Sequence, residues 1–119
     1  MAFWLLLKLQ VCQHLQMPVN KDFSGFIFMS GTSCTGNAED EFANALTHYN
    51  PNHCPHPSHA GDFPPLLENN GIAYMSFLTN QFRVRDILGK VVIIHGSPDD
   101  FTSQPSGNSG KKIACGKIR

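Results

Sequence analysis

Hydrophobic residues in the second half of the chain follow the short, turn-bounded pattern of β-strands. Residues 72–79 read Ile-Ala-Tyr-Met-Ser-Phe-Leu-Thr and come directly after an Asn-Asn-Gly turn signal. Residues 91–94 are a continuous Val-Val-Ile-Ile run of the kind found in buried strands, and residues 113–118 have the pattern of a final strand. These segments predict an all-β sandwich or barrel.

Two long segments next to these strands have no regular pattern. They cover residues 34–65 and 96–110 and are rich in Gly, Pro, Ser, Asn and Asp. Within the first segment, Ala43–Leu46 allows at most one helical turn. Loops of this length in a small domain are usually functional or disordered. We therefore expect a β-domain that carries two large loops.

The beginning of the chain follows neither pattern. Met1–Gln16 is apolar without a clean period of two, so it does not fit the pleat of a half-buried strand. The run Met1–Lys8 is too short and too soon interrupted for a membrane helix. It also lacks the charged start and the small-residue cleavage site of a signal peptide.

Size and charge restrict the possible partners. The chain has 119 residues, which is enough for one small domain, and a formal net charge of zero. No electrostatic case therefore exists for nucleic acid or for an acidic membrane surface. The basic residues close to the C-terminus, Lys111, Lys112, Lys117 and Arg119, indicate by themselves only a solvated tail.

The cysteine pattern leaves one or two disulfides open. The chain has four cysteines, Cys12, Cys34, Cys54 and Cys115, and none of them are in Cys-x-x-Cys spacing. This spacing argues against a thiolate zinc site and against a thioredoxin-like motif. A bridge between Cys34 and Cys115 would close a long loop, worth about 4–5 kcal/mol by chain entropy. Such a bridge would indicate secretion or another oxidising compartment.

The first long loop contains a candidate metal site. Three histidines and an aspartate, His48, His56, His59 and Asp62, fall within fifteen positions of a Pro- and Asn-rich segment. Zinc accepts histidine nitrogen and aspartate oxygen in a tetrahedral shell, and one rigid loop can supply all four ligands. A single loop histidine would be a solvated bystander. The spacing of the four together predicts a metal site.

Five ordered motifs resemble those of the copper/zinc superoxide dismutase family. They are His-Tyr-Asn-Pro at 48–51, His-Ala-Gly-Asp-Phe-Pro at 59–64, Gly-Lys-Val-Val-Ile-Ile-His at 89–95, Pro-Asp-Asp at 98–100 and Gly-Asn-Ser-Gly-Lys-Lys-Ile-Ala-Cys-Gly at 107–116. We assign residues 25–118 to a domain of this kind and residues 1–24 to a divergent or out-of-frame N-terminal segment. The resemblance implies a Greek-key β-barrel whose first strands are lacking or distorted.

The resemblance also implies the roles of five metal ligands. His48 would be the imidazolate that bridges copper and zinc, and His56, His59 and Asp62 would complete the zinc site. His95, at the end of its strand, would be a copper ligand. Implied cofactors are therefore Zn²⁺ and copper cycling between Cu²⁺ and Cu⁺. The implied reaction is the conversion of superoxide to oxygen and hydrogen peroxide, in a chain compatible with a homodimer.

Further roles follow from the same resemblance. Asp99 would orient ligands of both metals from the outer shell. Lys112 would guide the anion in place of the family's arginine, with the charge but without the bidentate fork. Cys34 and Cys115 would form the intrasubunit disulfide. Four residues match nothing in the family pattern and are interpreted as bystanders: Cys12, His14, His53 and Cys54.

The chain departs from the family at two copper ligands. The family has Gly-Phe-His-x-His-Glu where residues 25–30 read Gly-Phe-Ile-Phe-Met-Ser. Ile27 has no lone pair, and Met29 offers only a thioether, which favours Cu⁺. Codons for this segment, read in the next frame, can spell His-Phe-His-Glu, which is the basis for interpreting the N-terminal segment as out of frame. Two alternatives to a dismutase follow, a copper-deficient zinc-binding relative and a non-functional frameshifted product.

Overall fold

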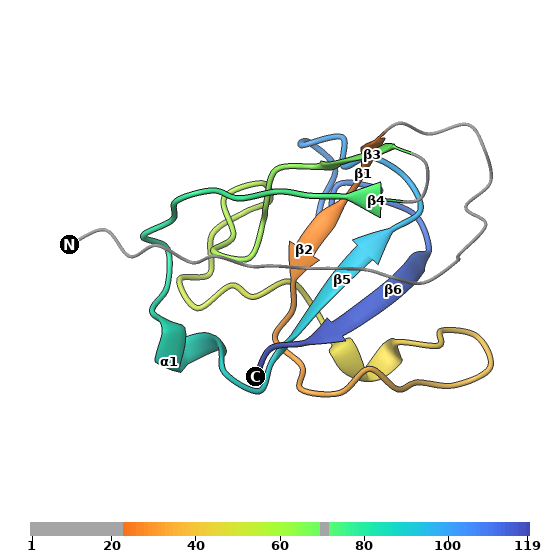
Figure 1. The fold of residues 1–119 in the computed structure, drawn as a ribbon, viewed down its shortest axis with the longest axis horizontal. Coiled ribbons are helices and arrows are strands. Elements are labelled where there is room, and N and C mark those ends of the chain that lie inside the picture. The colour runs from red at the N-terminus through yellow and green to blue at the C-terminus, as the bar shows by residue number, and fades with distance from the viewer. Residues whose placement is uncertain (1–22, 70–71) are drawn as a thin grey trace.

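The described residues form two antiparallel sheets of three strands each, with the orders β1–β3–β4 and β2–β5–β6 (Figure 1). A computed structural model describes residues 23–69 and 72–119. Its elements are β1 Phe23–Ser24, β2 Phe26–Phe28, the 3₁₀ turn η1 Ala43–Ala45, β3 Leu66–Asn69, β4 Ile72–Ala73, α1 Val84–Ile87, β5 Val91–His95 and β6 Lys112–Lys117. This architecture is the predicted all-β sandwich.

Strand β5 is the centre of the second sheet. All five of its residues are buried, and four of them are β-branched side chains that favour the pleated backbone. It pairs antiparallel with β2 on one side and with β6 on the other, and Ile93 lies opposite both Ile27 and Cys115. The register shifts between Ile94 and His95. Such an irregularity re-aims the side chain that follows it, here the histidine at the end of the strand.

Both faces of the β2–β5–β6 sheet are buried. Phe26 and Phe28 belong to a cluster on one face that includes Val92 and Ile94 and several aromatic rings of the loops. The residues of the other face are Ile27, Met29, Val91 and Ile93, which pack with Ala45 of η1. Each such fully buried side chain contributes about 1.5–3 kcal/mol by removal from water. Loop 34–65 therefore packs against the hydrophobic core and also contains the candidate metal ligands.

Two of the three predicted strands are confirmed, and the third is mostly wrong. The runs 91–94 and 113–118 correspond to β5 and, one residue earlier, to β6. Of 72–79, only Ile72–Ala73 forms a strand. Residues 74–79 still alternate between exposed and half-buried, and Met75 and Phe77 pack on the core. Residues 74–79 thus have the alternating burial of a strand but are assigned only a single bridge position, at Thr79.

The sequence patterns missed β1, β2, β3 and α1. Helix α1 is short and is capped by the Asp86 carboxylate, which accepts a hydrogen bond from the Arg83 N–H at 3.0 Å. The single turn expected at 43–46 is present as η1. No helix in residues 23–69 and 72–119 is long and apolar enough to cross a bilayer. The interpretations placed on Met1–Gln16, Cys12, His14 and most of the 1–24 segment lie outside the described residues.

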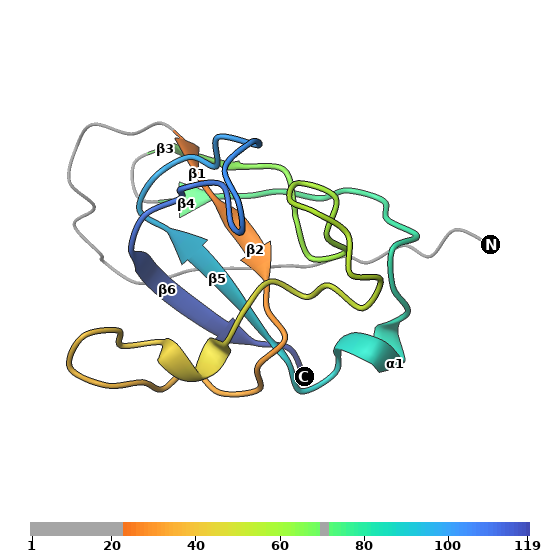
Figure 2. The ribbon, with the colours of Figure 1, turned by 180° about the vertical axis from the view of Figure 1, so that it is seen from behind.

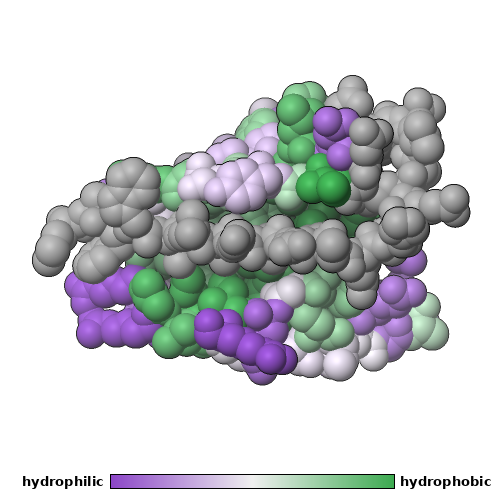
Figure 3. Space-filling view, viewed as in Figure 1, coloured by the Kyte–Doolittle hydropathy of each residue, from purple (hydrophilic) through white to green (hydrophobic). Residues whose placement is uncertain are grey.

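Apolar side chains are also exposed at the surface. They include Phe23, Leu67 and Ile72 of the β1–β3–β4 sheet and Val84 and Leu88 at α1. In the space-filling view, hydrophobic surface accordingly appears both along the top of the molecule and beside α1 (Figure 3).

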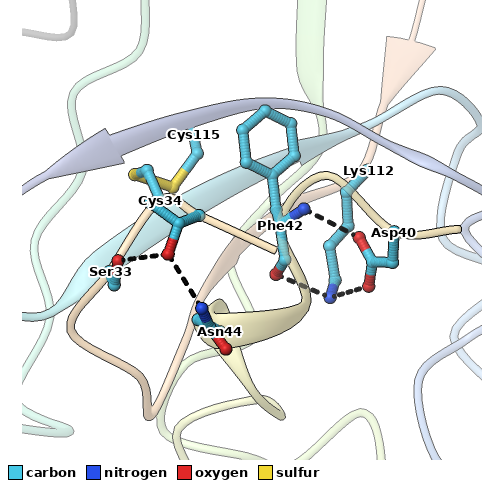
Figure 4. The surroundings of a disulfide bond; sticks show 8 residues. Ser33, Cys34, Asp40, Phe42, Asn44, Lys112 and Cys115 are labelled. Carbon is cyan, nitrogen blue, oxygen red and sulfur yellow. Dashed lines mark hydrogen bonds and ion pairs between the residues drawn. A yellow bond between two sulfur atoms is a disulfide. The ribbon is translucent and has the colours of Figure 1, made fainter. Parts of the chain in front are cut away.

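A disulfide joins the beginning of the first long loop to the last strand. Cys34 and Cys115 are bonded across a sequence separation of 81 residues, which confirms the pairing that the family resemblance implied (Figure 4). Cys54 is a free, partly buried cysteine. The bridge ties loop 34–65 to β6 at the face where Met29 and Ile93 pack.

Removing this bridge is expected to lower the free energy of unfolding by about 4.5 kcal/mol, because the unfolded chain regains the entropy of a loop of this length. The measurement is urea unfolding of the oxidised protein and of a Cys34→Ala/Cys115→Ala double variant. The control is Cys54→Ala, which removes a thiol that is in no disulfide. A loss no larger than that of the control would contradict the expectation.

Candidate metal centre

Strand β2 brings together the two ends of residues 48–62, the part of the first long loop that carries the four candidate ligands and is called the ligand loop below. Isolated β-bridges pair Met29 with His48 and Ile27 with Asp62. Between them, Phe28 donates its N–H to Gly61 at 2.9 Å and accepts the N–H of Tyr49 at 2.9 Å. Residues 48 and 62 are therefore held close to each other along β2 and the residue that follows it, Met29. The ligand loop leaves β2 at one and returns to it at the other.

The four predicted zinc ligands converge around the Asp62 carboxylate. Ligand atoms of His48, His56, His59 and Asp62 all lie within 4.8 Å of one another. The Nδ1 atoms of the three rings lie 2.8, 3.1 and 3.2 Å from Asp62 carboxylate oxygens. All four side chains are at most 8% exposed. Three imidazole nitrogens and one carboxylate at one buried point are the donor set that zinc prefers.

One of these rings is orientated by the second long loop. The Nε2 of His56 lies 2.8 Å from the Asp99 carboxylate, which can only accept, so Nε2 carries the proton. The Nδ1 of His56 faces Asp62 without hydrogen-bond geometry and has no hydrogen-bond partner in the described part of the chain. This nitrogen therefore presents its lone pair to the cluster. The contact from Asp99 comes from outside the cluster, and its role in orienting a metal ligand stays a prediction.

The backbone at Gly107 makes room for this contact. A Cβ at position 107 would lie 1.9 Å from the Asp99 carboxylate oxygen and 2.6 Å from His56 Nε2. Gly107 also has a φ of +68°, in the left-handed region that favours glycine. The sequence reading did not assign a role to this residue.

Asp62 is suited to a cation because it stays ionised. Burial by itself would raise the pKa of this carboxyl. Hydrogen bonds from the His48 ring and from the His59 backbone N–H outweigh burial, and the pKa is lower than its ordinary value. A buried, ionised carboxylate surrounded by three imidazoles is costly unless it is paired with a positive charge, so the site favours a bound cation.

His95 presents a second buried nitrogen. Its Nδ1 lies 2.9 Å from the Gly110 carbonyl, which can only accept, so this nitrogen carries the proton. Burial lowers the pKa of His95, against the opposite effect of the Gly110 hydrogen bond, and the ring is therefore neutral at neutral pH. Its Nε2, like the Nε2 of His48, is buried with no hydrogen-bond partner among the described residues. Two buried lone pairs are thus available, one on a ring of the four-residue cluster and one on His95, whose pKa the charge of His48 also lowers.

The other two positions of the family's copper site are apolar. Ile27 and Met29 are 1% and 2% exposed and pack with Val91, Ile93 and Ala45. Neither side chain supplies a nitrogen donor. His48 and His95 therefore offer two nitrogen ligands, whereas the family's copper site has four. The residues present fit zinc at the four-residue cluster and do not fit a complete Cu²⁺ site.

Lys112, the predicted anion guide, is tied down by the first loop. Its Nζ donates to the Asp40 carboxylate at 2.8 Å and to the Phe42 carbonyl at 3.1 Å (Figure 4). The Lys112 hydrogen bond also helps to hold the pKa of Asp40 below its ordinary value. The paired carboxylate offsets the positive charge that an approaching anion would meet. The role of Lys112 in guiding superoxide stays a prediction.

The remaining loop residues differ in their relation to the cluster. His53 is exposed and Cys54 is partly buried, and neither belongs to the group of converging ligands. Figure 2 shows segment 96–110 beside the ligand loop, and Gln104 hydrogen-bonds across to His56. The sequence reading missed Gln104 because a loop glutamine has no distinctive signal.

The turn that carries Gln104 predicts an unusual titration. Hydrogen bonds from the Ser103 hydroxyl and from the backbone N–H groups of Ser103 and Thr102 lower the pKa of Asp100 from 3.8 to about 2. A carboxyl with a lowered folded-state pKa stabilises the fold above 3.8, and this contribution is lost as the pH falls toward 2. NMR titration of the Asp100 carboxyl carbon checks the value. Ser103→Ala should move the midpoint toward 3.8, and an unchanged midpoint would contradict the assignment.

Comparison with known proteins decides the family. The family model described as copper/zinc superoxide dismutase matches residues 10–118. The chain belongs to this family. The match begins within the segment that we interpret as divergent or out of frame, and the boundary at residue 25 stays a prediction.

This family member is similar to proteins of several organisms. It is 35% identical over 94 residues to Superoxide dismutase [Cu-Zn] 1 of Aquifex aeolicus, which covers 66% of this chain and 56% of that protein. The chain thus spans about half the length of this curated relative. Its structure resembles that of Cu/Zn superoxide dismutase from Brucella abortus, with a TM-score of 0.71 and 25% identity over 84% of this chain and 74% of that one.

A second solved structure is also similar to this chain. It is a SOD-like protein from Bacillus subtilis, solved as a double mutant with a tyrosine and a proline each replaced by histidine. The TM-score is 0.63 and the identity 29%, over 82% of this chain and 72% of that one.

Proposed function

We propose that this chain is a zinc-binding member of the copper/zinc superoxide dismutase family, with His48, His56, His59 and Asp62 as the ligands. The observation that carries the proposal is the convergence of three ring nitrogens and one carboxylate within 4.8 Å, in side chains that are almost wholly buried. A loop without regular structure gains stability from such an ion, because the ion binds only the folded arrangement.

Zinc has a structural task at this place. The ligand loop is held to β2 at residues 48 and 62, while His56 and His59 lie on the part between these ends. The ion would join all four points and supply a closed tetrahedral centre. The Nε2 of His48 has no hydrogen-bond partner among the described residues. While Nδ1 of this ring faces the zinc site, Nε2 would stay available to a second metal ion.

Superoxide dismutation, the activity that names the family, is the second candidate. The observation in its favour is the pair of buried, unpartnered nitrogens, His48 Nε2 and His95 Nε2. These two nitrogens would hold copper, and Lys112 would attract the superoxide anion. Asp99 would keep the His56 ring in place. A family homodimer is compatible with this role. Ile27 and Met29 leave the copper shell incomplete, so we rank this activity below zinc binding.

Metal analysis of the purified full chain separates the candidates. We expect one zinc per chain, copper far below one, and no superoxide consumption above a free-metal blank. One zinc with one copper and clear superoxide consumption would favour the dismutase. Insoluble or unfolded protein would favour the non-functional frameshifted product. A folded, soluble chain that binds neither metal would contradict both metal-dependent proposals.

A further inference from the structure

A side chain of segment 96–110 hydrogen-bonds to the backbone of His56, one of the proposed zinc ligands. The side-chain amide of Gln104 accepts a hydrogen bond from the His56 N–H at 3.0 Å and donates one to the His56 carbonyl at 2.7 Å. Both polar groups of one peptide residue are thus satisfied by a single side chain that lies 48 positions away. This paired contact fixes the position of the His56 backbone relative to the second loop.

The same segment also holds the ring of His56. The Asp99 carboxylate lies 2.8 Å from His56 Nε2 and accepts the N–H of Phe101 at 2.7 Å, which fixes the carboxylate in turn. His56 is therefore held from segment 96–110 at three of its polar atoms. Its fourth polar atom, Nδ1, faces Asp62. Position and orientation of the donor nitrogen are set from outside the ligand loop.

The other two histidine ligands are held differently. His48 and His59 contact Asp62 and lie 3.3 Å from each other by their Nδ1 atoms, within the ligand loop itself. Their positions follow from the attachment of residues 48 and 62 to β2. His56 lies at the far part of the loop, six residues from Asp62, where no strand of the described chain fixes it. A support from another segment is needed there.

We infer that Gln104 is a positioning residue for metal capture: by holding the His56 backbone it pre-organises the third imidazole of the zinc site. This inference rests on the proposed zinc binding. Loss of an outer partner of a metal ligand typically reduces metal affinity 10- to 100-fold. Gln104 is itself exposed, so water replaces part of what its removal takes away. We therefore expect the lower end of this range, about ten-fold.

The test uses the full chain with Gln104→Met, which keeps the length and approximate volume of the side chain and removes both hydrogen-bonding groups. Gln81→Met is the matched control, because Gln81 is an exposed glutamine outside both loops. Zinc affinity is measured by chelator competition, and the Co²⁺ absorption spectrum reports on tetrahedral geometry. Hydrogen exchange of the His56 amide in the metal-free protein and urea unfolding complete the set.

We expect Gln104→Met to weaken zinc binding about ten-fold, to alter the Co²⁺ spectrum and to expose the His56 amide to exchange. The control should change none of these, and the urea midpoint of the metal-free variant should stay close to that of the parent. Equal zinc affinity and equal amide protection in the two variants would overturn the inference. If the parent binds no zinc but Gln104→Met still loses His56 protection, the proposed zinc function fails while the backbone grip stands.

Discussion

Asp62→Ala is expected to lower the zinc affinity by more than about 100-fold. Removing a residue that only hydrogen-bonds to a metal ligand costs up to about 100-fold, and removing a ligand itself should cost more. The carboxylate lies within 3.2 Å of all three imidazole Nδ1 atoms and supplies the only negative charge of the four ligands. Without it a dication would enter a buried site lined only by neutral nitrogens. The measurement is chelator competition for zinc, with Co²⁺ absorption as a second reading.

Two further variants sharpen this test. Asp62→Asn keeps the shape and one oxygen but loses the charge, so its affinity should fall between those of Asp62→Ala and the parent. Asp86→Asn, at the carboxylate that caps α1, removes a charge outside the site and should leave zinc binding unchanged. Similar affinities for the parent and Asp62→Ala would show that the four-residue cluster does not hold the ion.

The candidate ligands were visible in the sequence because their chemistry is local. His48, His56, His59 and Asp62 lie in one short segment, and the structure brings their donor atoms together. The sandwich was equally accessible, since residues 91–94 of the buried strand β5 are all β-branched and follow a turn. Pairing of Cys34 with Cys115 followed only from the family resemblance, because cysteine counting alone left several pairings open.

What the sequence could not supply are contacts between distant segments. The Lys112–Asp40 ion pair joins residues 72 positions apart, and the Gln104–His56 contact joins residues 48 apart. The sequence around each of these residues contains no signal that identifies its distant partner. The predicted length of the strand at 72–79 was wrong for a related reason: residues 74–79 have the alternating exposure of a strand, but alternation within one segment does not reveal whether a second segment pairs with it.

Restoring histidine at positions 27 and 29 is expected to produce the largest gain of function. Ile27 and Met29 are buried on the sheet face that Ile93 and Val91 share, and each is bridged to a residue of the four-residue cluster, Asp62 and His48 respectively. An Ile27→His/Met29→His variant adds two nitrogens to those of His48 and His95 and so completes a donor set suited to Cu²⁺. We expect about one copper per chain after reconstitution and superoxide consumption at least about 100-fold above the free-metal blank, which the parent should not exceed.

The metal-free form of this variant should be less stable than the parent. Each new imidazole replaces a core side chain and buries a polar group, which costs about 1–3 kcal/mol when its hydrogen bonds are unmet. Copper should restore this loss, so the thermal midpoint of the variant should rise with copper far more than that of the parent. Ile27→Val/Met29→Leu is the control, because it changes the same two positions without adding a donor. Copper binding and activity in that control, or a histidine variant that takes up copper and stays inactive, would show that positions 27 and 29 are not what separates this chain from its active relatives.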